Sequence, residues 1–264
     1  MKKVIEQFRW IGVYLTSSIG KKQQLAVAGA ALTAFLGGHA LGNLKLLNPD
    51  PVAAQASYNA YCAFLMSLKP FLYAIEGGLA ALLLFHAAMA LVLKLGNRKA
   101  RGPQRYAVVA RKGEATPGSF TMFLTGSAIL VFMIQHLVFF KFGEYYLYRN
   151  AAGEIVRDMW LTAADTFANP LWTLVYVAAL LVLGLHLMHA LPSLFRTFGL
   201  AHRKWTPIFN LIAAAIELGL MCSFLAAAVG TCVLANRENA KDLRANAHSL
   251  QQALQTELAE EASK

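Results

Sequence analysis

The sequence predicts an all-α integral membrane protein, a bundle of five transmembrane helices with an amphipathic C-terminal tail. Three observations lead to this fold class. Of the 264 residues, 57% are hydrophobic and only 14% are charged. The mean hydropathy is +0.47. The apolar residues gather in five stretches of about 20 residues or more, the length that crosses about 30 Å of hydrocarbon as a helix.

The five predicted spans are separated by polar connections. Their ranges are 25–46, 70–95, 120–141, 169–193 and 207–234. The first four end close to a cation, and the fifth is apolar apart from Asn210, Glu217 and a few small hydroxyl residues. Residues 1–24 form an amphipathic cytoplasmic segment, and residues 25–234 form the membrane domain. Residues 235–264 form a polar tail with apolar residues at helical spacing, so we expect an amphipathic helix on the outer surface or against a partner.

Charge predicts the orientation of these spans. The formal net charge is +10, but the cations cluster in short segments between apolar stretches, which does not indicate nucleic acid binding. The N-terminal segment and the connections after the second and fourth spans are basic, whereas the opposite side is mixed in charge. The positive-inside rule therefore places the N-terminus in the cytoplasm and the C-terminus outside. We expect a multi-pass protein of the bacterial cytoplasmic membrane.

The candidate metal ligands are histidines rather than cysteines. The three cysteines form no C-x-x-C motif, so zinc, iron–sulfur and c-type haem sites are unsupported. Four spans each carry a histidine five to eight residues before the closing cation: His39, His86, His136 and His189. An ionisable side chain in a bilayer is costly and usually marks a site. One such histidine is more readily explained by an interhelical hydrogen bond, but four favour two bis-histidine haem sites.

The direction of the spans sorts these histidines into two pairs. The first and third spans run outward, so His39 and His136 lie toward the outer face. The second and fourth run inward, so His86 and His189 lie toward the cytoplasmic face. His186 precedes His189 by one turn on the same helix face and stays open as the alternative fourth ligand. The distance to the closing cation favours His189.

Polar groups near the outer end of the second span are candidate quinone ligands. Glu76 is the candidate catalytic residue, because a quinone that takes two electrons also takes two protons. Tyr58, Asn59 and Tyr61 precede the same span and are able to hydrogen-bond a quinone carbonyl. The alternatives are a hydrated interfacial carboxylate for Glu76 and an interfacial aromatic belt for the tyrosines.

The basic connection after the second span has three candidate roles. Arg98, Arg101 and Arg105 contribute to the orientation signal. They also suit the propionates of an inner haem and a docking surface for a soluble subunit.

Several stretches of the chain resemble one known family when they are taken together. They are Ser17-Ser18-Ile19-Gly20-Lys21-Lys22, Gly38-His39-Ala40-Leu41-Gly42-Asn43-Leu44, Tyr58-Asn59-Ala60-Tyr61, Arg98-Lys99-Ala100-Arg101, Thr125-Gly126 with His136, and His186-Leu187-Met188-His189-Ala190 with Ser193 and Phe195. Over roughly residues 15–210 the sequence resembles the dihaem cytochrome b membrane anchor of succinate dehydrogenase/fumarate reductase.

The resemblance implies the electron-transfer subunit of a succinate:quinone oxidoreductase of the respiratory chain and tricarboxylic acid cycle. Such a subunit holds two b haems, here with His39 and His136 farther from the soluble partners and His86 and His189 nearer. Its partners are a flavoprotein and an iron–sulfur subunit on the cytoplasmic face, a membrane quinone, expected to be menaquinone, and further copies of the complex. The chain departs from some members in having Leu187, not an acidic residue, two positions before the last ligand. That acidic residue is associated with transmembrane proton movement.

Two other functions stay open at this point. One is a dihaem cytochrome b anchor of a different dehydrogenase, such as a formate dehydrogenase or a hydrogenase. The other is a haem-free transporter with histidines in a proton relay. The sequence shows neither the inverted repeat nor the paired broken helices that mark many transporters, which disfavours the second alternative.

Overall fold

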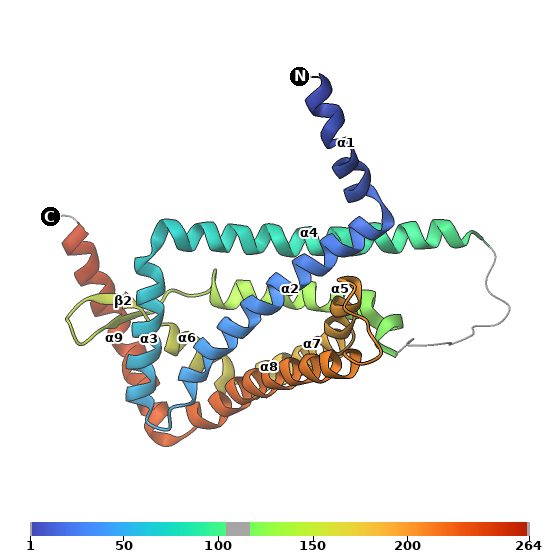
Figure 1. Ribbon diagram of the computed structural model, residues 1–264. Coiled ribbons are helices and arrows are strands. Elements are labelled where there is room, and N and C mark those ends of the chain that lie inside the picture. Colours follow the sequence, from blue (N-terminus) through green and yellow to red (C-terminus); the bar gives the residue numbers. More distant parts are fainter. Residues whose placement is uncertain (1, 104–116, 263–264) are drawn as a thin grey trace. The chain divides into compact units, whose positions relative to one another are not determined.

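The computed structural model describes residues 2–103 and 117–262, with side chains for 8–103 and 121–260, and this part of the chain is mostly helical (Figure 1). In chain order the elements are α1 (Lys2–Thr16), α2 (Ser18–Asn43), the 3₁₀ helix η1 (Leu44–Leu47), α3 (Pro51–Ser67), α4 (Lys69–Arg101), α5 (Pro117–Phe140), β1 (Leu147–Arg149), β2 (Ile155–Arg157), α6 (Met159–Ala168), α7 (Pro170–Thr197), α8 (Thr206–Ala235) and α9 (Glu238–Ala262). The basic residues Arg105, Arg111 and Lys112 lie outside the described residues.

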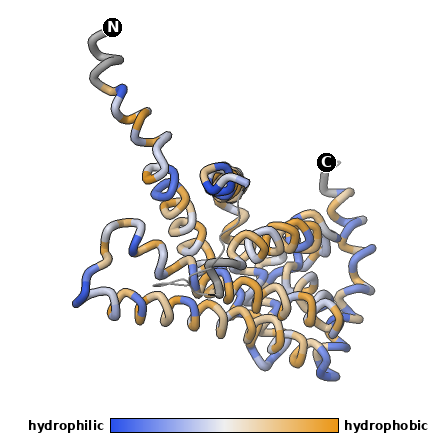
Figure 2. The backbone as a smooth tube through the Cα atoms, turned by 90° about the vertical axis from the view of Figure 1, so that its right-hand side faces the viewer, coloured by the Kyte–Doolittle hydropathy of each residue, from blue (hydrophilic) through white to orange (hydrophobic). Residues whose placement is uncertain are grey.

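Five helices of the described part are long and apolar enough to cross a membrane, which confirms the predicted fold class. The spans are Ser18–Leu47, Lys69–Arg101, Thr121–Phe140, Pro170–Thr197 and Thr206–Ala235. Figure 2 shows long apolar stretches along the helices, with hydrophilic residues concentrated near turns and in the C-terminal helix. The predicted ranges therefore fall on the observed spans.

The largest differences between the predicted ranges and the observed helices are at α2 and α4. Helix α2 begins at Ser18 rather than at residue 25, and α4 continues to Arg101 rather than ending at residue 95. Arg98, Lys99 and Arg101 form the last turn of α4. Lysine and arginine are good helix formers, and cations stabilise the negative, C-terminal end of the helix dipole. Helix α4 therefore continues past its apolar stretch.

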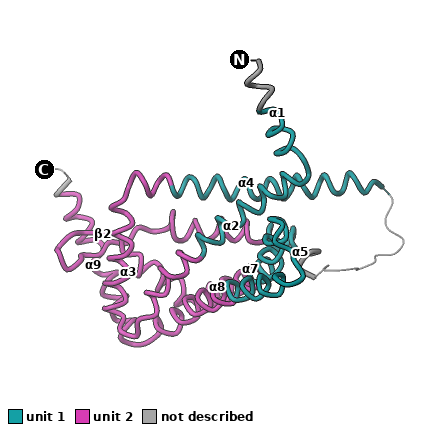
Figure 3. Tube along the Cα trace, in the orientation of Figure 1, with its two compact units in different colours: residues 1–36, 75–127, 184–217 teal, residues 37–74, 128–183, 218–264 magenta. Residues whose placement is uncertain are grey.

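The chain divides into two compact units (Figure 3). Unit 1 comprises Met1–Leu36, Ile75–Ser127 and Gly184–Glu217, and unit 2 comprises Gly37–Ala74, Ala128–Leu183 and Leu218–Lys264. Each of the five spanning helices contributes a segment to both units. Large apolar side chains of unit 1 are exposed, including Leu84 (63%), Leu124 (71%) and Leu211 (70%), as expected of surfaces that face lipid.

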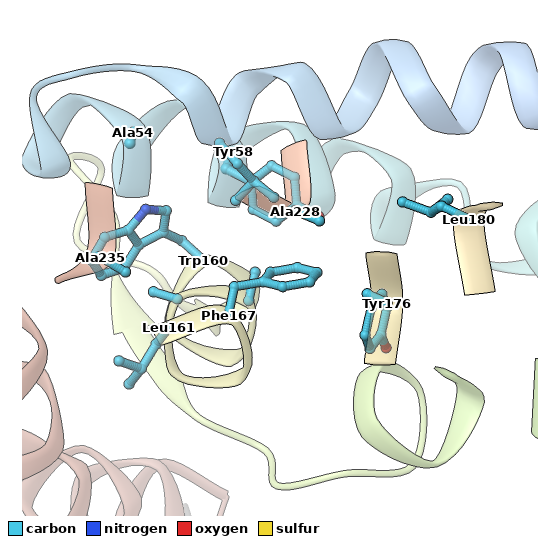
Figure 4. Close-up of a cluster of buried hydrophobic side chains, with 12 residues drawn as sticks. Ala54, Tyr58, Trp160, Leu161, Phe167, Tyr176, Leu180, Ala228 and Ala235 are labelled. Carbon is cyan, nitrogen blue, oxygen red and sulfur yellow. The ribbon is translucent and has the colours of Figure 1, made fainter. Parts of the chain in front are cut away.

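Unit 2 has a compact core around α6. Trp160, Leu161 and Phe167 of α6 are buried in the same cluster as Tyr58 of α3 and Tyr176 of α7 (Figure 4). Helix α6 is capped at its N-terminus by Asp158, whose side chain accepts a hydrogen bond from the Leu161 backbone N–H at 2.9 Å. This N-cap satisfies a donor that the helix itself leaves unpaired.

The C-terminal helix α9 packs against the same chain rather than standing apart. Strands β1 and β2 form an antiparallel hairpin in which Tyr148 pairs with Val156. The Gln251 amide of α9 accepts a hydrogen bond from the Leu147 backbone N–H at 2.7 Å and donates one to its carbonyl at 3.0 Å. Arg244 of α9 donates to Asp165 of α6 at 2.7 Å. The predicted amphipathic tail is therefore held by α6 and the hairpin of its own unit.

Candidate functional site

Two histidines from different spanning helices meet in unit 2. The ring centroids of His39 on α2 and His136 on α5 lie 5.9 Å apart, with the rings nearly perpendicular at 89°. Phe224 of α8 lies 5.8 Å from the His39 ring. Aromatic side chains near the pair come from three spanning helices, α5, α7 and α8.

Tyr176 of α7 holds His136 in place. Its hydroxyl lies 3.3 Å from His136 Nδ1, and its side chain is only 5% exposed. The tyrosine ring is fixed edge-on by Phe132 and Phe167, each with its centroid 5.0 Å away. Because Nδ1 is engaged by the hydroxyl, Nε2 is the nitrogen left for a metal ion.

In unit 1, His86 of α4 lies against a glycine of α2. A Cβ atom at Gly29 would lie 3.3 Å from His86 Cε1 and 3.7 Å from Nδ1. The missing side chain therefore lets the imidazole approach the backbone of the neighbouring helix. The Leu25 backbone is also close to this ring, yet Nδ1 is buried and makes no hydrogen bond of normal geometry with the described residues.

His186 of α7 repeats this arrangement with α5. A Cβ atom at Gly126 would lie 3.3 Å from His186 Cε1 and 3.8 Å from Nδ1. The Thr125 hydroxyl lies 3.0 Å from His186 Nδ1. In both cases the Nδ1–Cε1 edge of the imidazole faces a glycine of a neighbouring helix.

The two histidines at the end of α7 have different surroundings. His186 contacts Thr125 of α5 and lies within electrostatic range of His86 and His189. His189 lies one turn later, within electrostatic range of Arg196. The structure thus groups His39 with His136 in unit 2 and places His86, His186 and His189 in unit 1.

A spacing in the sequence accompanies this geometry and was not used in the sequence analysis. Gly29 stands ten residues before His39 on α2, and Gly126 stands ten residues before His136 on α5. Each of these helices therefore carries a glycine for a histidine of unit 1 and a histidine of its own in unit 2. The repeated spacing is the signal that would have identified Gly29, whereas Thr125 and Gly126 already stand among the motifs that carry the resemblance.

Tyr58 and Asn59, candidate quinone ligands, make contacts that hold α3 in unit 2. Asn59 is fully buried, donates to Asp158 Oδ1 at 2.8 Å and accepts from the Trp160 backbone N–H at 2.9 Å. The Tyr58 hydroxyl donates to Asn43 Oδ1 at 3.1 Å. Both polar atoms of Asn59 are therefore used within the chain.

The other two quinone candidates fall in different units. Tyr61 lies in unit 2, where its ring packs against Gly42 and under the Lys45 ammonium, 5.9 Å from the ring centroid. Glu76 belongs to unit 1, near the start of its α4 segment, and is half-buried. Arg98 and Arg101 are exposed at the end of α4, and Arg105 lies outside the described residues.

A buried carboxylate escaped the sequence analysis. Asp158 is fully buried and accepts hydrogen bonds from Gln55 Nε2 at 2.6 Å and from Asn59 Nδ2. Burial raises the pKa of Asp158, although hydrogen bonds from Asn59, the Leu161 N–H and Gln55 act in the opposite direction. Its donors come from α3, about 100 residues earlier in the sequence, so no local pattern marks it.

Comparisons of the chain with protein families, with curated proteins and with solved structures give no match. The site is therefore interpreted from its own residues and geometry.

Proposed function

We propose that this protein is a dihaem cytochrome b that passes electrons across a membrane. The observation that carries the proposal is the presence of histidines from facing helices in each unit, set among small and aromatic residues. Two imidazoles are the donor set of an iron that brings its other four ligands in a porphyrin. The Nδ1 contacts at His136 and His186 leave Nε2 available for coordination, so the residues present fit haem.

The proposed ligands are His39 and His136 for one haem and His86 and His186 for the other. The distance to the closing cation favoured His189 as the fourth ligand. The contacts of His186 with Thr125 and Gly126, and its proximity to His86, support His186 instead. When bound, the two haems supply one-electron chemistry, while the chain supplies ligation, spacing and exclusion of water.

We further propose that the chain anchors a succinate dehydrogenase or fumarate reductase. This step rests on the resemblance of its motifs alone. The haems would then connect an iron–sulfur subunit in the cytoplasm, bound next to a flavoprotein, with a membrane quinone such as menaquinone. The basic segments support an N-terminus in the bacterial cytoplasm. With His186 as the ligand, the position two residues earlier is Gly184, which is no more acidic than Leu187.

The ligand assignment is tested by optical spectra of the purified protein and its variants. We expect reduced b-type bands with two haems per chain. His39→Ala and His136→Ala should remove one haem, and His86→Ala and His186→Ala the other. His189→Ala and His202→Ala are the controls and should keep both low-spin spectra.

Each failure of this test has a definite meaning. A protein without haem would overturn the proposed function. Loss of the same haem from His39→Ala and His86→Ala would overturn the pairing. Loss of a haem from His189→Ala, with both kept in His186→Ala, would return the fourth ligand to His189. Reduction of the haems by succinate in membranes, but not by formate or hydrogen, would identify the dehydrogenase that the chain serves.

Glu76 is the proposed proton donor and acceptor for the quinone. Glu76→Gln should slow quinone turnover while both haem spectra and dye-linked succinate oxidation by the soluble subunits stay normal. Glu217→Gln, which changes the other carboxyl of a spanning helix in unit 1, is the matched control. Normal quinone turnover in Glu76→Gln would leave this carboxyl with an interfacial role only.

A further inference from the structure

Two of the four proposed haem ligands share one feature. His136 and His186 each have a buried hydroxyl from a neighbouring helix at Nδ1: Tyr176 at 3.3 Å and Thr125 at 3.0 Å. The two hydroxyl residues are only 5% and 7% exposed. The contacts lie in different units, so each unit has one such pair.

The direction of the hydrogen bond at Thr125 follows from its other contacts. Thr125 Oγ1 lies 3.1 Å from the Thr121 carbonyl and 3.1 Å from the Met122 carbonyl. A carbonyl accepts only, so either of these two oxygens is able to take the hydroxyl hydrogen. The Thr125 oxygen is then free to accept from His186 Nδ1–H. In that tautomer Nε2 carries no hydrogen and is free to bind a metal ion.

Iron ligation gives the same direction at Tyr176. An imidazole that binds iron through Nε2 carries its remaining hydrogen on Nδ1, so the Tyr176 oxygen accepts from His136 Nδ1–H. The Gln135 side chain lies beside the Tyr176 hydroxyl and acts on it as a hydrogen-bond donor.

We propose that Tyr176 and Thr125 are positioning residues that set the redox potentials of the two haems, one residue for each haem. This inference rests on the proposed haem function. An Nδ1–H that donates to an oxygen makes the imidazole a stronger electron donor at Nε2. A more basic axial ligand stabilises the ferric state over the ferrous state. Each hydroxyl therefore lowers the midpoint potential of the haem that its histidine binds.

The test is a redox titration of the haem absorption bands in the purified haem-loaded protein. Tyr176→Phe keeps the ring that packs on Phe132 and Phe167 and removes only the oxygen. It should raise the potential of the haem bound by His136 and leave the other unchanged. Thr125→Val should raise the potential of the haem bound by His186 alone. We expect about a tenfold change in the ratio of oxidised to reduced haem at a given potential, which is about 59 mV for a one-electron couple.

Matched variants separate positioning from packing. Thr125→Ser keeps the hydroxyl and should restore the wild-type potential. Thr173→Val removes another buried hydroxyl of α7, one that donates to the Phe167 carbonyl at 2.8 Å, and should shift neither haem. If Tyr176→Phe does not retain its haem, Gln135→Leu leaves the tyrosine in place and removes the amide beside its hydroxyl. A shift in the potential of the same haem alone is then expected.

The outcomes also distinguish this inference from the function on which it rests. If the wild-type protein binds no haem, the proposed function is wrong. If both haems are present and Tyr176→Phe and Thr125→Val leave the potentials unchanged, lower them, or shift the same haem, the positioning role is wrong while the cytochrome assignment stands.

Discussion

Cys62 is a half-buried thiol near Arg157 and Asp158 in unit 2. Burial raises its pKa to about 12, against the opposing effect of Arg157. The thiolate is the reactive form, so at pH 8 its fraction is about a thousandfold below that of a thiol with the ordinary pKa of 9.0. In a protein with Cys222 and Cys232 replaced by serine, we expect very slow iodoacetamide labelling that rises tenfold per pH unit up to about pH 11. Unfolding the protein first should restore ordinary labelling, and a plateau near pH 9 in the folded protein would contradict the assignment.

The candidate haem ligands could be predicted from the sequence only in part. The histidines of the spans were identifiable because charge is rare in apolar helices. The choice between His186 and His189 could not be made from α7 alone, since both lie on one helix face. It depends on Thr125 and Gly126, which stand about 60 residues earlier. In the same way, the Asn59 amide is a chemically suitable quinone ligand, but the sequence does not reveal that it bonds to Asp158, which is about 100 residues away.

The packing of α3 on α6 depends on the buried carboxylate of Asp158. Asp158→Ala removes the acceptor for Gln55, Asn59 and the Leu161 N–H, and leaves these buried donors unpaired. Each unsatisfied donor costs about 1–3 kcal/mol, and the lost helix cap about 1 kcal/mol. We expect a clear drop in the melting temperature of the detergent-solubilised protein. Asp50→Ala, which removes the exposed cap of α3, is the control and should cost less.

The contribution of Asp158 to stability depends on pH with a definite sign. The folded state raises the pKa of Asp158 above its ordinary value of 3.8, so it holds the proton more firmly than the unfolded chain. The contribution of Asp158 to stability is therefore full below pH 3.8 and falls as the pH rises through the raised value. Asp158→Asn should flatten this decline in the melting temperature between pH 4 and pH 8. An unchanged profile would show that other groups cause it.

The sequence predicted the five spans but not the shorter elements between them. The five spans follow from hydropathy because each needs about 20 apolar residues. The hydropathy criterion does not detect α3, α6 and the β1–β2 hairpin, because these elements are shorter or less apolar than a membrane span. The tail was recognised as an amphipathic helix, but its partners Leu147 and Asp165 are far away in sequence.

Helix α9 is held by a few polar contacts, and we expect it to detach when they are removed. Arg244→Ala breaks the bond to Asp165, and Gln251→Ala breaks both bonds to Leu147. Limited proteolysis should then cut within residues 238–260 several times faster, since cleavage follows the population of the opened helix. Glu238→Ala removes only an exposed pair with Lys241 inside α9 and is the control. Equal cleavage of all variants would mean that apolar packing and the remaining pairs, Arg149–Glu257 and His248–Asp165, are enough to hold the helix.

At the scale of the whole molecule, the histidine pairs support the proposed haem binding, and the charges support the proposed orientation and partners. Each unit contains one pair of the proposed ligands, so under the proposal each binds one haem with ligands of its own. The charges concern orientation and partners. The connection between α4 and α5 carries more cations than orientation needs, because the N-terminal segment and the connection between α7 and α8 are also basic.

We expect the exposed end of α4 to bind an acidic surface of the iron–sulfur subunit. Arg98→Glu combined with Arg101→Glu should reduce the amount of that subunit that copurifies, and more so as salt is raised, because exposed charge pairs are screened. Arg203→Glu with Lys204→Glu makes the same change in charge on the same predicted side and should have little effect. A reporter fused to the N-terminus must show an unchanged orientation in both proteins. If copurification is then equal in the two, Arg98 and Arg101 act only in orienting the chain. If both pairs weaken it equally, the subunit responds to the total positive charge of that side rather than to the end of α4.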